Sequence, residues 1–309
     1  MPDFGVTTKP RPKRVDDLID SELMAKLDQV DVVSRKIFAG KLQGERRSKR
    51  RGVSVEFADY RHYVHGDDLR FVDWNIYARL DRLFLKLFLE EEDLSLLIAI
   101  DTSASLDWGN PNKFVYAQQL AMALGYIGLV NNNRVTLYAF NQQEMLPLPS
   151  LRGRRRTREI GTWLLNLEPA GGSAFDDAMR TVALTRQGKG VMIILSDFMF
   201  KEGYEKGLRY LAGGGYDTFC MQLLSPEEID PGKHGLAGDL RLTDLEDDDT
   251  AEVTVSAALL KRYKENLNAY CGKLRDFCIR RAISHLTIDT SNDLTTLLLD
   301  YLRRRGLLK

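Results

Sequence analysis

LSLLIAIDTSAS, residues 94–105, is a mostly apolar run that ends in acidic and hydroxyl side chains. A short apolar run without alternation is typical of a strand buried on both faces, usually at the centre of a parallel sheet. Ligand sites in open α/β sheets lie just beyond the carboxyl ends of such strands, where Asp101, Ser103 and Ser105 fall. Their oxygens suit a hard divalent cation such as Mg²⁺ or Mn²⁺. This stretch alone leaves open that the Ser and Thr side chains only cap the following turn or helix.

The composition is that of a globular protein without overall charge. The chain has 309 residues, of which 44% are hydrophobic and 28% charged, and its formal net charge is zero. One large or two modest domains fit this length. A zero net charge gives no overall field toward nucleic acid or a membrane surface. Local charge is uneven, however, with basic runs at residues 9–14, 46–51 and 152–158.

Several features of the sequence favour a reduced, cytoplasmic protein. The N-terminus lacks the apolar core of a signal peptide. No segment approaches the roughly 20 apolar residues of a membrane span. The three cysteines, Cys220, Cys271 and Cys278, form no CxxC pair and no even set.

Periodicity divides the chain into three expected parts. Residues 1–15 are expected to be a flexible basic tail, and residues 16–93 a helix, a charged linker at 44–52 and a small β subdomain. In residues 94–309, strands alternate with helices, which predicts an α/β, doubly wound, mainly parallel sheet with helices on both faces. The strands are expected at 94–101, 135–140, 191–195, 217–224 and 284–289, and an inserted hairpin near 239–256.

Oxygen-bearing side chains follow two of these strands and one Gly-Gly turn. Asp101, Ser103 and Ser105 follow the first strand, Ser173 follows a Gly-Gly turn, and Asp197 follows the strand at 191–195. If the first strand and the 191–195 strand are neighbours, all of these side chains meet at one edge of the sheet.

The spacing resembles the von Willebrand factor A-type domain with its metal-ion-dependent adhesion site. That site combines an Asp-x-Ser-x-Ser motif, a Thr on a second loop and an Asp on a third. The resemblance implies that Ser103 and Ser105 bind the metal directly, with Asp101 and Asp197 acting directly or through water. Ser173 stands where the family usually has Thr and keeps the hydroxyl, whereas Ala174 replaces an Asp that often follows.

A second resemblance covers residues 51–105. This segment is similar to the bacterial domain of unknown function 58 family, whose pattern RG-x4-F-x-D-x-R-x-Y-x2-GDD-x-R-x-ID-W-x3-AR leads through K-x-F-x-E-E into an A-type domain. The family resemblance implies a MoxR-type AAA+ ATPase partner and a role as a metal-binding adaptor in chaperone-like assembly or maturation. The matching positions are Arg51, Gly52, Phe57, Asp59, Arg61, Tyr63, Gly66, Asp67, Asp68, Arg70, Asp73, Trp74, Ala78, Arg79, Lys86 and Glu91.

The same charged run has a direct interpretation from its residues. Aspartates lie among arginines over 51–79, so bidentate pairs are expected to knit the small subdomain to the sheet. A binding surface for another molecule is the alternative.

Two other classes of function are alternatives for this sequence. A buried strand ending in Asp also begins haloacid-dehalogenase-like phosphatases, which need a second acid where this chain has Ser103. A metal-dependent phosphoryl-transfer enzyme is therefore an alternative, and catalysis is not expected. Nucleic-acid binding through the basic loops is a further alternative, but no aromatic residues are interleaved with the arginines. We expect the basic loop at 152–158 to lie near the metal and steer an acidic protein toward it, through Arg152, Arg154, Arg155 and Arg156.

Overall fold

The computed structural model describes residues 11–32, 56–89, 94–185, 190–212, 215–235, 238–243, 245–246 and 250–309. The chain divides into two compact units, a large unit of residues 1–39 and 94–309 and a small unit of residues 40–93. Most of the expected tail at 1–15 and all of the linker at 44–52 lie outside the described residues.

A six-stranded sheet forms the centre of the large unit. Its strands are β3 (Ser95–Asp101), β4 (Arg134–Phe140), β5 (Met145–Leu151), β6 (Gly190–Ser196), β7 (Tyr216–Leu224) and β10 (Ser284–Asp289). The order is β10-β7-β6-β3-β4-β5, and every neighbouring pair is parallel except β4 with β5. The strand order therefore reverses direction between β3 and β6, the kind of switch point where α/β sheets bind ligands.

The burial of β3 explains why the sequence of this strand is an unbroken apolar run. Six of its seven residues are buried. Leu96, Ile98 and Ile100 pack into one core, while Leu97 and Ala99 pack into another on the opposite face. Because both faces are covered, the strand shows no alternation of apolar and polar residues.

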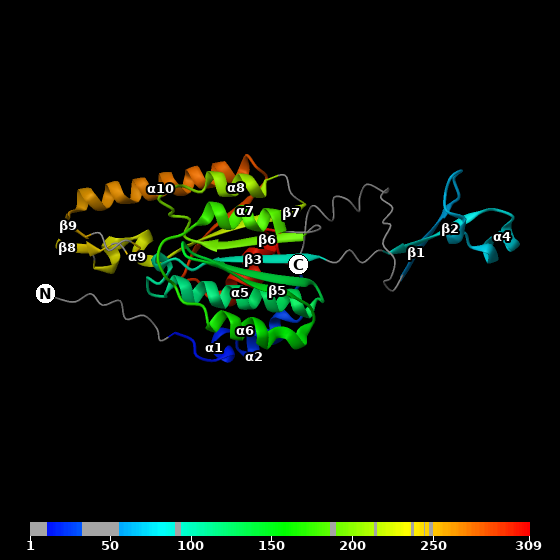
Figure 1. Ribbon diagram of the computed structural model, residues 1–309, viewed down its shortest axis with the longest axis horizontal. Coiled ribbons are helices and arrows are strands. Elements are labelled where there is room, and N and C mark those ends of the chain that lie inside the picture. The colour runs from blue at the N-terminus through cyan, green and yellow to red at the C-terminus, as the bar shows by residue number, and fades with distance from the viewer. Residues whose placement is uncertain are drawn as a thin grey trace. The chain divides into compact units, whose positions relative to one another are not determined.

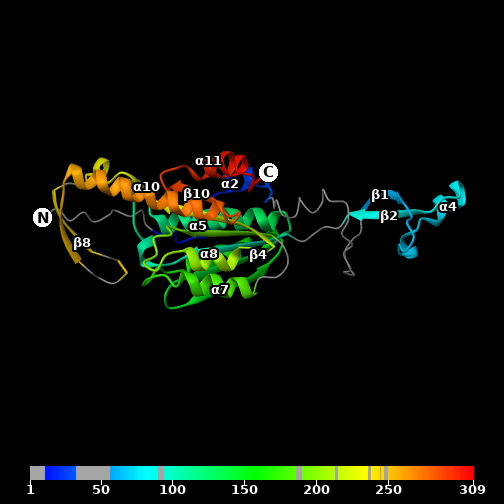
Figure 2. The same cartoon turned by 90° about the horizontal axis from the view of Figure 1, so that it is seen from above.

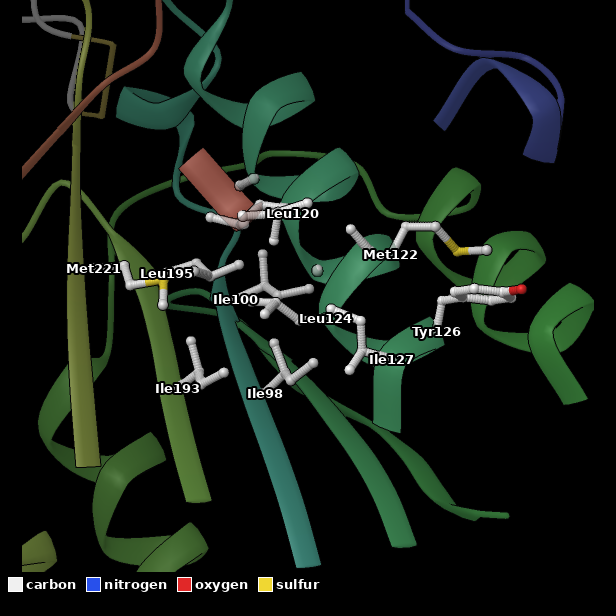
Figure 3. Packing of buried hydrophobic residues seen from close by; sticks show 14 of the residues in the cluster. Ile98, Ile100, Leu120, Met122, Leu124, Tyr126, Ile127, Ile193, Leu195 and Met221 are labelled. Carbon is white, nitrogen blue, oxygen red and sulfur yellow. The ribbon is translucent and has the colours of Figure 1, made fainter. Parts of the chain in front are cut away.

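Helices cover both faces of the sheet, as predicted (Figure 1). One face carries α5 (Lys113–Val130) and α6 (Thr157–Leu165), and the other carries α7 (Phe175–Thr185), α8 (Glu205–Leu211) and α10 (Ala257–Ile279). The closing segment, α11 (Leu294–Thr296), a π-helical turn (Leu297–Tyr301) and α12 (Leu302–Arg304), packs on the first face. Figure 3 shows the first core, where side chains of β3 meet those of α5 and β6: Ile98, Ile100, Leu120, Leu124, Ile127, Ile193 and Leu195.

The edge strand β5 was not anticipated. Its sequence, MLPLPSL, contains Pro147 and Pro149, which cannot donate to a ladder hydrogen bond. Proline is tolerated on an edge strand, and β5 pairs only with β4 in the described sheet.

A hairpin of β8 (Gly238–Thr243) and β9 (Thr250–Val255) is present where an insertion was expected. It follows two short turns, α9 (Pro226–Ile229) and η4 (Pro231–His234). Figures 1 and 2 both show it beside the start of α10, at the end of the large unit toward which the β6 arrow of Figure 1 points. Among the described residues, no helix combines the length and the apolar character that crossing a membrane would need.

The expected domain boundary needs a correction at the N-terminus. We grouped the helical segment that begins at residue 16 with the small β subdomain, but α1 (Val15–Leu18) and α2 (Ser21–Leu27) belong to the large unit. Leu18, Leu23 and Leu27 are buried in the core beneath α5. Packing in this core removes these apolar side chains from water. Residues 33–42 of the expected helix lie outside the described residues.

The small unit pairs β1 (Glu56–His62) with β2 (Phe84–Leu89) in an antiparallel hairpin. Between them lie η1 (Leu69–Phe71) and α4 (Trp74–Leu80), a helix that was not anticipated. The charged run forms ion pairs within the unit. The N–O distances are 2.8 Å for Arg61 with Asp67, 2.6 Å for Arg70 with Asp68 and 3.1 Å for Lys86 with Asp73.

Asp73→Ala is expected to speed amide hydrogen exchange in α4, whereas Arg70→Ala leaves it unchanged. The Asp73 carboxylate caps α4 by accepting from the backbone N–H of Asn75 and Ile76, and it also accepts from Lys86. Arg70 and Asp68 are 78% and 40% exposed, and exposed pairs contribute little. Exchange measured by mass spectrometry over residues 74–80 tests this. Unchanged exchange in both variants would favour the alternative that the charged run serves as a binding surface.

Candidate metal centre

The loop after β3 is tied to two other loops by backbone hydrogen bonds. The Thr102 N–H donates to Phe140 O at the end of β4 (2.9 Å), and the Ala170 N–H donates to Thr102 O (2.9 Å). The Ala104 N–H donates to Gly171 O (2.8 Å), immediately before the turn that carries Ser173. The Asp-x-Ser-x-Ser loop and the Ser173 loop therefore lie side by side.

Asp101 ends β3 inside the protein, with no exposed surface. Its Oδ1 accepts from the Ser103 N–H (2.9 Å) and its Oδ2 from the Ser196 hydroxyl (2.8 Å). Burial, and then the nearby charge of Asp197, raise the pKa of Asp101 to about 7. The carboxyl group is therefore poised between its protonated and ionised forms near neutral pH, and a bound cation would favour the ionised form.

Three hydroxyl groups accompany this carboxyl group. Ser103 is buried, and its Oγ lies 3.0 Å from Ser105 Oγ. The Oγ of Ser173 is buried and has no hydrogen-bond partner within the described part of the chain. A buried hydroxyl without a partner costs free energy, so its presence requires an explanation. A divalent cation fits these residues because it would give the Ser173 oxygen a partner.

Asp197 follows β6, the parallel neighbour of β3. Its Oδ2 lies 2.8 Å from the Nζ of Lys113, and its Oδ1 accepts from the Met199 N–H (3.0 Å). The side chains of Lys113 and Asp197 are 1% and 4% exposed. Asp197 is thus held in an ion pair inside the protein.

The backbone after Asp197 turns through a strained residue. Phe198 has a φ of 58°, in the left-handed region that residues other than glycine rarely adopt. The Ser196 hydroxyl accepts from the Phe198 N–H (2.9 Å), and the Tyr270 hydroxyl donates to Phe198 O. Such strain persists only where surrounding contacts enforce it, and it often marks functional sites.

The five predicted site residues lie on three loops at the carboxyl edge of the sheet, as expected. Within the described residues, no group of three or more His, Cys, Asp and Glu side chains is arranged to hold a metal. The candidate set instead combines two carboxylates with three hydroxyls: Asp101, Ser103, Ser105, Ser173 and Asp197.

The arginine run lies elsewhere, which corrects the expectation that it is near the metal. Arg152 directly follows Leu151, and Leu151 pairs with Val135 at the start of β4. Because β5 is antiparallel to β4, it returns the chain to the opposite edge of the sheet. Arg154 binds Asp28 there (3.1 Å), and Arg156 binds Glu159 (2.7 Å). Arg155 lies in the same short turn.

Sequence reasoning missed three contributors to the site. Ser196 supports Asp101, Lys113 binds Asp197, and Glu228 binds Lys113. Lys113 carried one signal, because a lysine that begins an 18-residue, largely apolar helix is unusual. Glu228 carried only a local signal, because Ser225 and Glu228 have the spacing of a helix capping box, and this motif does not point to Lys113.

The sequence matches the family described as "Protein of unknown function DUF58" over residues 59–271. The chain belongs to this family. The strand order above confirms the predicted doubly wound, mainly parallel α/β sheet with helices on both faces. Uncharacterized proteins of Mycobacterium bovis and Mycobacterium tuberculosis are 26% identical to it over 248 residues, covering 79% of this chain and 77% of theirs.

Two solved structures align with part of the chain at low identity. The conserved hypothetical protein BatB from Bacteroides thetaiotaomicron aligns with 13% identity over 68% of this chain and 98% of its own, with a TM-score of 0.43. The VWA domain of SpRpn10 aligns with 15% identity over 67% of this chain and 94% of its own, with a TM-score of 0.39.

Asp101→Asn is expected to stabilise the metal-free protein at high pH. In the folded protein the pKa of Asp101 is raised to about 7, whereas the ordinary pKa of an aspartate is 3.8. Wild-type stability contributed by this group is therefore present at low pH and is lost as the pH rises between these values. The Asn side chain has no proton to lose, so its advantage grows over that range.

Thermal unfolding of both proteins in chelator, at about pH 5 and about pH 8, measures this difference. The gain in unfolding midpoint should be small at the lower pH and larger at the higher one. An equal midpoint difference at both pH values would contradict a raised pKa for Asp101.

Proposed function

We propose that this DUF58 protein is a non-catalytic adaptor that binds a protein partner through a divalent cation, Mg²⁺ or Mn²⁺. The cation would be held by Asp101, Ser103, Ser105, Ser173 and Asp197. The observation that carries this proposal is the buried Ser173 Oγ, which has no hydrogen-bond partner in the described structure. It lies on the loop that is bonded to the Asp-x-Ser-x-Ser loop.

The chemistry of these groups supports a hard cation. All five side chains offer oxygen, which Mg²⁺ and Mn²⁺ prefer. Five protein oxygens leave at least one coordination position to water, and a carboxylate of a partner can take that position. The role of this chain is to orient the oxygens from three loops and to keep Asp101 away from bulk water.

The proposed partner is a MoxR-type AAA+ ATPase or a client protein that it remodels, in chaperone-like assembly or maturation. The family resemblance supports this partner, and the A-type fold supports a role in protein interaction. The proposed role is non-catalytic because position 103, where a phosphatase of the haloacid-dehalogenase type needs a second acid, holds a serine. We also propose a cytoplasmic location, which the three free cysteines support.

Removing Asp101 is expected to abolish binding of the cation. Calorimetric titration of the wild-type chain with Mg²⁺ and with Mn²⁺ should show binding of one ion, and Asp101→Ala should show none. Mg²⁺ keeps part of its water shell, so its affinity is expected to be modest. Equal binding by the variant would rule out the site.

Ser173 gives a test that separates binding from folding. Ser173→Ala removes a hydroxyl that has no hydrogen bond to lose, so in chelator the variant should be at least as stable as the wild type. Its affinity for Mn²⁺ should fall, while Ser173→Thr, which keeps the hydroxyl, should retain binding. A large loss of stability of Ser173→Ala in chelator would show that the hydroxyl is already satisfied without a cation.

Partner binding is expected to need the cation. Co-purification with the ATPase from the native cell should weaken in chelator and in Asp101→Ala, and the chain should hydrolyse no ATP by itself. Thermal melts of the variant confirm that it is folded. The same partner recovered equally from both proteins in chelator would overturn metal-mediated docking.

A further inference from the structure

Lys113 is a buried ammonium at the candidate metal centre. It is the first residue of α5, which is capped by Asn112. The Lys113 Nζ lies 2.8 Å from Asp197 Oδ2 and 2.7 Å from Glu228 Oε1. The three side chains are 1%, 4% and 17% exposed. Lys113 therefore links the third loop of the site to the segment after β7.

The surrounding structure fixes this contact. Glu228 Oε2 accepts from the Ser225 N–H (2.8 Å), which holds the carboxylate in place at the start of α9. The loop before α5 approaches Ser225 closely at Gly109, where a Cβ would lie only 2.4 Å from the Ser225 Cβ. Gly109 also has a φ of +94°, which favours glycine. The contact between the two segments is thus built into the backbone.

Lys113 stays charged in this buried position. Burial disfavours the ammonium, but the charges of Asp197 and Glu228 outweigh this and hold the pKa of Lys113 above its ordinary value. A permanent positive charge therefore lies in contact with one of the proposed metal ligands.

This charge has two opposite consequences for Asp197. Without a cation, it neutralises a carboxylate that would otherwise be buried and unpaired, which is costly. With a cation, it competes for Asp197 Oδ2 and repels the incoming positive charge across a short distance in a medium of low dielectric constant. The other oxygen, Oδ1, already accepts from the Met199 N–H.

We propose that Lys113 sets the affinity of this site for divalent cations: it acts as an internal counter-ion that keeps the metal-free site folded and weakens metal binding. This inference rests on the proposed function, because it concerns the cation that Asp101 and Asp197 would hold. It assigns Lys113 a tuning role through Asp197 rather than a role as a ligand.

The direction of the effect distinguishes tuning from ordinary structural support. If Lys113 were only structural, its loss would disturb Asp197 and weaken metal binding. If Lys113 competes with the cation, removal of its charge strengthens binding, even though the metal-free variant is less stable.

The experiment measures Mn²⁺ affinity of the full chain by electron paramagnetic resonance of the free ion, together with thermal melts in chelator and in Mn²⁺. Lys113→Met should bind Mn²⁺ about tenfold more tightly or better. It should be less stable than the wild type in chelator and should gain more stability from Mn²⁺. Lys113→Gln removes the charge but keeps a hydrogen-bond donor, so it provides the same test if the Met variant does not fold.

Two controls separate this effect from a general change of charge. Arg11→Met also removes one positive charge near the same loop, where Arg11 binds Asp107 at 2.6 Å, but this pair is 49% and 34% exposed and should leave Mn²⁺ affinity unchanged. Glu228→Gln leaves Lys113 with Asp197 as its remaining charged partner, so it should weaken Mn²⁺ binding.

Each outcome decides between the two proposals. Tighter binding by the Lys113 variants, with unchanged Arg11→Met, supports the inference. Wild-type binding with equal or weaker binding by folded Lys113 variants overturns the inference and leaves the metal site intact. Absence of Mn²⁺ binding in the wild type and in every variant overturns the proposed function, and the inference with it.

Discussion

The burial of β3 on both faces is the constraint on which the rest of the large unit depends. Leucine and isoleucine side chains point into two separate cores, and each contributes roughly 2 kcal/mol when removed from water. The strand must therefore lie at the centre, between β4 and β6. Because both neighbours are parallel to it, the loops after β3, β4 and β6 leave the sheet at one edge. Burial of the apolar run thus determines where the polar residues after it can meet.

That arrangement brings two carboxyl groups to the ends of adjacent buried strands, and the protein treats them differently. Asp101 receives a backbone N–H and a hydroxyl, and burial raises its pKa to about 7, so the proton itself can neutralise it. Asp197 is neutralised by Lys113. One acid is thus available to exchange a proton for a cation, whereas the other carries a permanent counter-charge. The difference comes from the residues around each acid and not from the motif.

The candidate site contains polar and backbone groups that its own contacts do not fully satisfy. Ser173 Oγ has no partner in the described structure, and Phe198 has a strained backbone conformation directly after Asp197. Natural proteins concentrate such departures at functional positions, where stability is given up for binding or reactivity. Most of the surrounding polar groups are satisfied, and Ser196, Tyr270 and Gln222 all bond to the segment that holds Asp197. Two such departures, at Ser173 and Phe198, lie on the loops that carry the predicted ligands.

The sequence by itself determined the class of the fold and the residues of the candidate site. The unbroken run at 94–101 is typical of a strand at the centre of a covered, mainly parallel sheet, in which hydroxyl and acidic residues at the strand ends share an edge. The tertiary structure alone decided what surrounds them. Pairing of Lys113 with Asp197 and Glu228 joins segments that lie 84 and 115 residues apart, which no local pattern reports. Arg152 lies on the edge opposite the candidate metal centre because β5 runs antiparallel to β4. The prolines of β5 concealed this strand in the sequence. The packing of α1 and α2 within the large unit likewise depends on the tertiary structure, because their apolar side chains join the core that contains α5. Periodicity shows that a helix has such a face, but only the folded chain determines which partner covers it.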